Sequence, residues 1–290
     1  MKKIKKRNFS QDVMGVNNPF LRAFNYVLLI LGVLIVFTPI YIIFIIAFKS
    51  NKEYMFSGNF QLPKSFLYLD NFVNVIVKGK LLLGFQNTMF LVVVSVTLSI
   101  ILGTMVSYAI GRFEFRFKKT IITAFLLSTV IPSVTTQVAT FSVIKGLHLY
   151  NTLAGPILLY IGADIIQIYI FLQFISKIPY ELDESAMVDG ASYFKIYTSI
   201  ILPQMRPAIV TMAILKGLNI YNDMITPVLY MPKSSLRTVT TAIIAFSADQ
   251  NSQWNVMAAG IFAVLVPTLI LYIFAQKFII AGLSDGSVKG

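Results

Sequence analysis

Residues 84–110 read GFQNTMFLVVVSVTLSIILGTMVSYAI, a run of 27 residues without a charged side chain. A membrane-spanning helix needs about 20 predominantly apolar residues, so this run is long enough to cross a bilayer. The whole chain agrees, because 57% of its 290 residues are hydrophobic and 12% are charged. Soluble domains carry about 25% charged residues. The sequence therefore predicts an all-α, polytopic membrane protein in contact with the lipid bilayer.

Five further stretches are long enough to cross a membrane. They lie at 24–48, 120–141, 153–176, 207–230 and 256–276. Four are clearly apolar, and the fifth, 207–230, is apolar apart from a set of polar residues discussed below. Six spans place both termini on the same side of the membrane.

Six spans also divide the chain into three predicted segments. Residues 1–83 are expected to hold an N-terminal cytoplasmic segment, the first span and a long outer loop. Residues 84–280 are expected to form the transmembrane core, with a cytoplasmic loop at 177–206, and residues 281–290 a cytoplasmic tail.

Basic residues are distributed unevenly between the predicted loops. The side that holds the termini carries fifteen Lys and Arg residues, and the opposite side carries eight. Because cytoplasmic loops are enriched in Lys and Arg, we expect both termini in the cytoplasm. The net charge of +12 is typical of nucleic-acid binding as well, but these basic residues are scattered over short loops, so we expect no nucleic-acid partner.

Four of the twelve acidic residues fall between Glu181 and Asp189, in the loop 177–206. Pro179 followed by acids is typical of a helix start, since carboxylates suit the positive end of the helix dipole. Gly190 is a plausible stop, and Ser192 can cap a following helix. Leu182, Ala186 and either Val188 or Asp189 lie on successive turns, which predicts a small apolar face opposite an acidic one. Such a helix can lie on lipid, connect two spans in solvent, or dock a cytoplasmic partner, and acids so close to an anionic leaflet disfavour the first.

A charged residue within a span is expected to face a partner or a water-filled cavity. On a helix, Lys216, Asn219, Asp223 and Tyr230 fall close to one stripe, with Asn222 beside it. One interpretation is a packing seam, with Lys216 paired to Asp223 or to Asp164. The other is a lining for a translocation path, in which Tyr221 also offers its ring to a solute. Acids in spans often mark proton relays, but a single Asp without a nearby His or second acid favours a pair with Lys216.

No catalytic constellation is visible in the sequence. It has no Cys and one His, and it lacks the glycine-rich loop ending in Gly-Lys-Ser/Thr that binds ATP. We therefore expect no enzyme activity, no metal and no cofactor in this chain. Energy for transport, if it uses ATP, must come from another subunit.

The predicted loop helix resembles a known motif. Glu184-Ser185-Ala186, then Gly190, then Ile200 and Leu202-Pro203 are spaced as in the EAA loop of the membrane-spanning subunits of bacterial ABC importers, with Ser in place of the middle Ala. The resemblance implies that the helix docks on an ATP-hydrolysing subunit. The coupling residues it implies are Glu184, Ser185, Ala186, Asp189 and Gly190.

The likeness extends over about residues 70–290 and resembles the second permease subunit of the carbohydrate (maltose-type) importers. It is carried by Ser107-Tyr108-Ala109, Arg112-Phe113, Ile131-Pro132, Tyr221-Asn222-Asp223 with Pro227, and Gln276-Lys277-Phe278. Tyr221 stands where that family has Trp.

This resemblance implies a type I importer permease in the bacterial cell membrane that forms half of a sugar or oligosaccharide pathway. The implied partners are a second, unlike permease, two ATPase subunits that bind ATP and Mg, and an extracellular or periplasmic binding protein. The implied path residues are Lys216, Asn219, Tyr221, Asn222 and Asp223. The alternatives are a permease for an amino acid, oligopeptide or ion, and a secondary transporter that works without an ATPase.

Overall fold

The structure is a computed structural model and describes residues 19–162, 164–249 and 253–287. The described chain forms two compact units, Met1–Phe72 with Gln253–Phe262, and Val73–Ser252 with Ala263–Gly290. Helices account for its regular structure, and no strand forms among the described residues. The basic residues at positions 2–7, and Lys289 in the predicted tail, lie outside the described part of the chain.

The first unit contains the N-terminal span and the short helix that follows it. Helix α1 (Pro19–Ala47) confirms the span predicted at 24–48, and α2 (Asn51–Phe56) comes directly after it. Most side chains of α1 are exposed in the isolated chain, as expected for a helix whose solvent is lipid. At its end, aromatic rings pack against one another: Phe44, Phe48, Phe66, Phe72 and Phe262.

Asparagine side chains close the C-terminal end of α1. Nδ2 of Asn71 donates to the carbonyl oxygens of Ala47 and Lys49, each at 2.8 Å, and Nδ2 of Asn255 donates to Oδ1 of Asn71 at 2.9 Å. The ammonium of the fully buried Lys49 donates to Ser57 Oγ and to the Gly58 carbonyl, each at 2.9 Å. The bond from Asn71 to the Ala47 carbonyl satisfies one of the groups that every helix end leaves without a helical partner.

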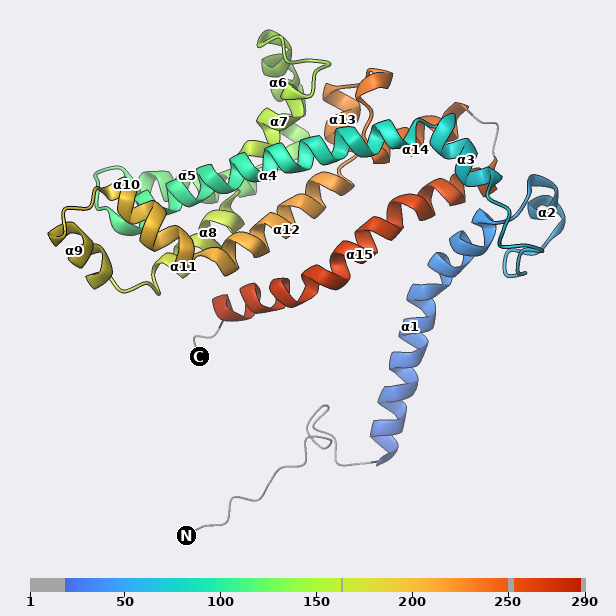
Figure 1. The fold of residues 1–290 in the computed structure, drawn as a ribbon, viewed down its shortest axis with the longest axis horizontal. Coiled ribbons are helices and arrows are strands. Elements are labelled where there is room, and N and C mark those ends of the chain that lie inside the picture. Colours follow the sequence, from blue (N-terminus) through green and yellow to red (C-terminus); the bar gives the residue numbers. More distant parts are fainter. Residues whose placement is uncertain (1–18, 163, 250–252, 288–290) are drawn as a thin grey trace. The chain divides into compact units, whose positions relative to one another are not determined.

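The second unit is built on α4 (Leu81–Arg112), the long helix that confirms the span predicted at 84–110 (Figure 1). Helices α8 (Ile165–Ile175), α12 (Arg206–Asn222), α7 (Ala154–Ile161) and α14 (Val239–Asp249) pack along it. The buried face of α4 consists mainly of small residues: Gly84, Thr88, Ser95, Ser99, Gly103, Thr104 and Ser107. Small residues allow helices to approach closely within a membrane, where the apolar solvent provides no hydrophobic drive for association.

The remaining described elements include the long C-terminal helix α15 and several shorter helices. They are α3 (Asp70–Val77), α5 (Lys118–Val130), α6 (Ser133–Gly146), α9 (Glu181–Val188), α10 (Tyr193–Ile196), the π-helical η2 (Tyr197–Ile201), α11 (Leu202–Gln204), α13 (Ile225–Tyr230), the 3₁₀ turn η3 (Ser234–Leu236) and α15 (Trp254–Ser287).

Three described helices are long and apolar enough to cross a membrane, Phe20–Ala47, Leu81–Arg112 and Trp254–Lys277. The number rises to six if each of three sharply bent helix pairs counts as one span. The predicted number of six spans is therefore compatible with the structure, but the third bent pair, Tyr193–Gln204 with Arg206–Asn222, begins earlier than the span predicted at 207–230. Helix α15 continues to Ser287, so the described part of the tail predicted at 281–290 is helical.

Helices α5 and α6 divide the span predicted at 120–141. The sequence predicts a kink at Pro132, and the structure shows a bend of 111° between the two helices. Ile131 is extended, with φ −81° and ψ 115°, because a residue before proline is forced out of the helical region. A proline ring also removes a backbone donor, so the helix cannot continue through it.

Helices α7 and α8 divide the span predicted at 153–176, which was expected to be one helix. They are bent by 45°, and the carboxylate of Asp164 accepts the backbone N–H of Gln167 at 2.8 Å as the N-cap of α8. An aspartate cap stabilises a new helix start. The span predicted at 207–230 is likewise divided, because α12 ends at Asn222 and α13 begins at Ile225.

Candidate functional site

Helix α9 occupies the position that the acidic segment predicts. It begins at Glu181 and ends at Val188, and Gly190 after it adopts a left-handed conformation with φ +80°. The N–H of Ala191 donates to the Ala186 carbonyl, and the N–H of Gly190 donates to the Met187 carbonyl. This pair of bonds is the Schellman motif, in which a glycine is the residue best able to reverse the chain. The predicted helix and its glycine stop are therefore confirmed.

Ser192 caps the next helix, as predicted. Its Oγ accepts the backbone N–H of Lys195 at 3.3 Å, which starts α10. The chain continues directly into the π-helical η2 and then α11, and a bend of 75° separates this segment from α12. Single π-helical turns are rare and often lie at functional sites. The chain from Tyr193 to Asn222 is thus helical apart from the bend at Met205, and α9 precedes it across the turn at 189–192.

An ion pair attaches α9 to the last turn of α4. Arg112 Nε lies 3.0 Å from Asp183 Oδ2, and the two side chains are only 7% and 5% exposed. Arg112 also donates to the Ile178 carbonyl at 3.0 Å, and its guanidinium lies 5.5 Å from the centre of the Tyr180 ring. A nearly buried pair with these additional contacts holds the helix in one orientation. Burial raises the pKa of Asp183 above its ordinary value, and the positive charge of Arg112 opposes that rise.

Sequence reasoning missed Asp183 as a residue of this site. It treated Leu182, Ala186 and Val188 as one apolar face and the acids as the opposite face. In the structure Asp183 and Ala186 face the protein, whereas Leu182 is 41% and Val188 87% exposed. The prediction that only the apolar face of α9 packs on the protein is wrong. The buried face includes Asp183, because its partner Arg112 is itself buried. The available signal was Arg112, the basic residue at the cytoplasmic end of a predicted span.

An aromatic cluster lies beneath α10 and η2. The ring of Tyr108 packs on Phe113 at 5.6 Å and on Tyr197 at 5.4 Å, and Phe113 packs edge-on against Tyr193 at 5.1 Å. The hydroxyls of Thr104 and Tyr197 are 2.9 Å apart. These contacts join the end of α4 to the segment that directly follows α9.

The outer surface of α9 carries four of the five predicted coupling residues. Glu184, Ser185, Asp189 and Gly190 are exposed, and Ala186 is half-buried against the core. Exposed apolar side chains lie near them, including Tyr180 at 48%, Leu182, Val188, Tyr193 and Phe194. The helix is thus rigidly held from below and presents a mixed acidic and apolar surface above.

The polar set in α12 is arranged differently from the predicted stripe. Lys216 lies 3.7 Å from Asp164 and donates to the Gly162 carbonyl at 2.8 Å. Of the two carboxylates considered as its partner, the structure selects Asp164. The ammonium therefore joins α12 to the break between α7 and α8.

Asp223 lies beyond the end of α12 in an extended conformation. Its carboxylate accepts the Tyr160 hydroxyl at 2.9 Å and the Thr226 N–H at 3.2 Å. The prediction that one helical stripe runs through Asp223 to Tyr230 is wrong, because the aspartate ends one helix and bonds to the first turn of the next.

Asn219 and Asn222 are exposed, and Lys216 is half-buried. Tyr221 is buried, and its hydroxyl donates to the Val264 carbonyl at 3.0 Å. Its ring is therefore a packing element in this conformation rather than a surface offered to a solute. Asn219 and Asn222 are the predicted path residues that the described chain leaves exposed.

A helical chain with several apolar spans and a docked surface helix at one end defines a multi-pass membrane protein of the permease class. The chain belongs to the family of inner membrane components of binding-protein-dependent transport systems, whose profile matches residues 89–279.

Named relatives agree over most of the chain. A probable starch degradation products transport system permease protein of Thermoanaerobacterium thermosulfurigenes is 31% identical, covering 91% of this chain and 97% of that one. An arabinooligosaccharides transport system permease protein of Halalkalibacterium halodurans is 30% identical, covering 87% and 91%. A chain from the crystal structure of a bacterial ABC transporter involved in alginate import matches with a TM-score of 0.80 at 19% identity, covering 94% and 99%, which shows a shared fold.

Proposed function

We propose that this chain is one half of the membrane pore of an ATP-driven importer for a sugar or oligosaccharide. Family membership supports the class, and the names of the two relatives, which refer to starch products and arabinooligosaccharides, support the solute. The importer lies in the bacterial cell membrane, and the excess of Lys and Arg on one side supports cytoplasmic termini.

The observation that carries this proposal is the way in which α9 is attached to the rest of the chain. The buried Arg112–Asp183 pair fixes the helix, while Glu184 and Ser185 stay exposed for a partner. Two ATPase subunits bind ATP and Mg and dock on α9 and on its counterpart in a second, unlike permease. A binding protein outside the cell delivers the solute. Closure of the ATPases moves α9, and the movement passes through α10 and η2 to α12.

The polar residues of α12 form this chain's share of the path. Asn219 and Asn222 offer amide donors and acceptors to sugar hydroxyls, and Lys216 with Asp164 holds the neighbouring helix break in place. Asp223 positions this region through Tyr160, and Tyr221 supports it from within.

The test of coupling is the double variant Glu184→Lys with Gly190→Val. We expect it to lose co-purification with the ATPase or solute-stimulated ATP hydrolysis, because α9 changes charge and the turn after it is strained. The matched control is Glu114→Lys, a charge reversal in the loop after α4, where Glu114 is 88% exposed and pairs with Lys118. Wild-type stimulated hydrolysis in the double variant would refute the docking role.

The test of the solute and path is uptake of labelled oligosaccharides by Lys216→Met, Asn219→Ala and Asn222→Ala. We expect reduced uptake in at least the two asparagine variants with unchanged ATPase association. Normal uptake in all three would exclude these residues from the path. Uptake of an amino acid or peptide instead of a sugar identifies the alternative permease, and uptake without any ATPase identifies a secondary transporter.

A further inference from the structure

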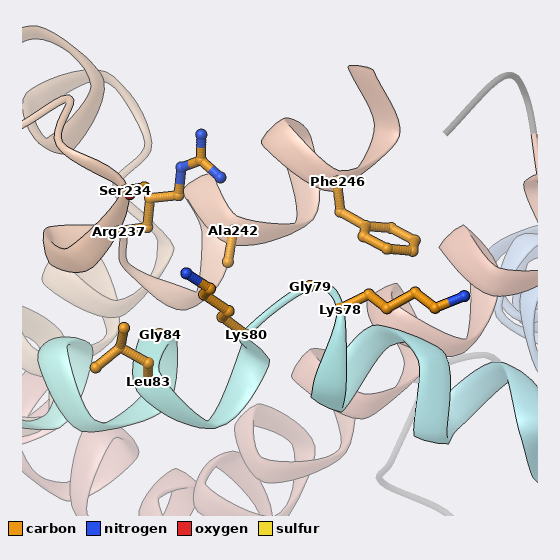
Figure 2. Close-up of a pocket in the computed structure, with 9 residues that line it drawn as sticks. All are labelled: Lys78, Gly79, Lys80, Leu83, Gly84, Ser234, Arg237, Ala242 and Phe246. Atoms are coloured by element: carbon orange, nitrogen blue, oxygen red, sulfur yellow. The ribbon is translucent and has the colours of Figure 1, made fainter. Parts of the chain in front are cut away.

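A cavity of about 210 Å³ lies at the first turn of α4, at the end of that helix remote from α9. Its walls come from the turn between α3 and α4, the start of α4, and the segment from η3 to α14 (Figure 2). The lining residues are Lys78, Gly79, Lys80, Leu83, Gly84, Ser234, Arg237, Ala242 and Phe246. Three of the nine are cationic and none is acidic, which distinguishes this cavity from a solvated surface of mixed charge.

Lys80, in the turn before α4, has an unfavourable backbone conformation. Lys80 is left-handed, with φ 52°, a conformation that L-residues other than asparagine and aspartate rarely adopt. Gly79 before it is required by space, since a Cβ there would contact the Val75 carbonyl. Asparagine or glycine would suit position 80 better, so the lysine is retained against the backbone preference. Such outliers persist where the surrounding structure or a function demands them.

Hydrogen bonds from side chains of α4 hold the backbone around Arg237, on the other side of the cavity. Nδ2 of Asn87 donates to the carbonyls of Ser235 at 3.0 Å and Arg237 at 2.9 Å. Oγ1 of Thr88 accepts the Val239 N–H at 2.9 Å, which holds the start of α14. A Cβ at Gly84 would lie 3.1 Å from this segment, so its close approach needs the glycine. The backbone that carries Arg237 is therefore anchored independently of its charge.

Figure 2 shows the ammonium of Lys80 directed toward the side of the cavity that holds Ser234 and Arg237, while Lys78 extends away along Phe246. Within the described part of the chain, the side chains of Lys80 and Arg237 make no ion pair. Two cations held on rigid backbone beside a hydroxyl attract an anion, and phosphate oxygens suit Lys as a point charge and Arg as a fork of donors.

The position of the cavity relative to the membrane indicates the source of the anion. The cavity lies at the first turn of a helix long enough to cross the membrane, and the uncharged run of that helix begins at Gly84 in the cavity wall, which favours a position near the membrane surface. Ile76, Val77 and Leu82 nearby are 47%, 67% and 63% exposed, and Leu83 and Phe246 contribute apolar walls. We propose that this cavity binds the phosphate of an anionic phospholipid, with Lys80, Arg237 and Ser234 on the phosphate and the apolar residues on the glycerol and acyl chains. The proposal does not depend on which solute the permease carries.

The experiment uses the full-length chain in nanodiscs of phosphatidylcholine with one-fifth phosphatidylglycerol. After transfer to detergent, native mass spectrometry counts the phosphatidylglycerol that stays bound. Each cation near a membrane surface contributes about 1 kcal/mol to anionic-lipid binding, so Lys80→Asn with Arg237→Gln is expected to weaken retention about thirtyfold and each single change about fivefold. Asparagine relieves the left-handed backbone at position 80, which protects the fold of the variant.

Lys233→Gln is the matched control, because Lys233 is exposed in the same loop and does not line the cavity. It is expected to retain phosphatidylglycerol as the wild type does, as are the charge-preserving Lys80→Arg and Arg237→Lys. Equal retention by the wild type and the double neutral variant would overturn the proposal. Displacement of the lipid by millimolar inorganic phosphate would show a free-anion site and overturn the lipid assignment. If the double variant aggregates, the phosphatidylglycerol retained by each single neutral variant is compared with that retained by the wild type, and equal retention overturns the proposal.

Discussion

The guanidinium of Arg112 and the carboxylate of Asp183 lie 3.0 Å apart, although 71 residues separate them in the chain. One residue ends the longest helix of the second unit, and the other lies in the first turn of α9. Both side chains are nearly buried. The orientation of the surface helix therefore depends on one ion pair that nothing in the local sequence of either partner requires.

Breaking this pair from one side is expected to release α9. Asp183→Asn removes the carboxylate that orients the guanidinium of Arg112, so the contact that fixes the position of α9 is lost. The measurement is the rate of tryptic cleavage at Lys177 and Lys195, which flank the helix.

The double variant Arg112→Met with Asp183→Leu removes both charges and is expected to recover most of the protection, because a buried pair contributes little net stability over apolar packing. Equal cleavage rates in Asp183→Asn and the wild type would show that the pair does not hold the helix.

Asp183 also gives α9 a dependence on pH. Burial raises the pKa of its carboxyl, so the folded state binds a proton more tightly than the unfolded state does. This contribution to stability is complete below the ordinary pKa of about 4 and is lost as pH rises through the raised pKa. In Arg112→Met the positive charge that opposes the rise is gone, so the pKa of Asp183 is expected to rise further. The stability contribution of Asp183 is then lost at a higher pH than in the wild type.

The check is the difference in melting temperature between the wild type and Asp183→Asn across the acidic range. That difference should change with pH. Glu181→Gln, at an exposed position of the same helix, should show the same dependence of melting temperature on pH as the wild type. A pH-independent difference between wild type and Asp183→Asn contradicts the prediction.

Substitution of Gly190 is expected to act through the backbone alone. A Cβ at this position would meet nothing within 4 Å, but φ is +80°. Alanine there costs about 1–2 kcal/mol, valine more, and asparagine less, since asparagine tolerates the left-handed region. Hydrogen exchange of the Gly190 and Ala191 amides should rise in the order asparagine, alanine, valine. The same exchange rate in all three variants would show that the turn is not strained.

The contact between α4 and α8 depends on the absence of a side chain at Gly103. A Cβ there would lie 2.6 Å from Nε2 of Gln167, which donates to the Ser99 carbonyl at 3.0 Å. Gly103→Ala is expected to displace this fully buried amide and destabilise the chain by about 1–3 kcal/mol.

Gly32→Ala is the matched control, because a Cβ at Gly32 in α1 would meet nothing within 4 Å. It is expected to be neutral or slightly stabilising, since alanine is the better helix former. Melting temperatures in detergent compare the two, and a tolerated alanine at position 103 would disprove the close packing.

Local sequence rules worked where the cause of a structure was local. The uncharged run at 84–110 became one helix, and Pro179, the acids and Gly190 bounded α9 within a residue or two. A proline signal at Pro132 was also read correctly as a break, although its 111° bend was not predictable, because the angle depends on the packing of both halves. Asp164 was read as a charge in a span, whereas its cap on Gln167 starts a new helix.

Long-range partners were harder to predict. For Lys216 the sequence left Asp223 and Asp164 as candidate partners and favoured Asp164, and the fold confirms that pair at 3.7 Å. Tyr221 carried the pattern of a path residue, but its exposure depends on which helix covers it, and α15 accepts its hydroxyl at Val264.

By itself the sequence determined that this chain is a helical membrane protein with an acidic surface helix, because apolar run length and helix-capping residues act over a few turns. The tertiary structure alone decided which acid of that helix is buried against Arg112, where the spans break, and that Lys80 and Arg237 share one cavity. The physical reason is that ion pairs and cavities join residues far apart in the chain, and helix periodicity carries no information about which helices become neighbours.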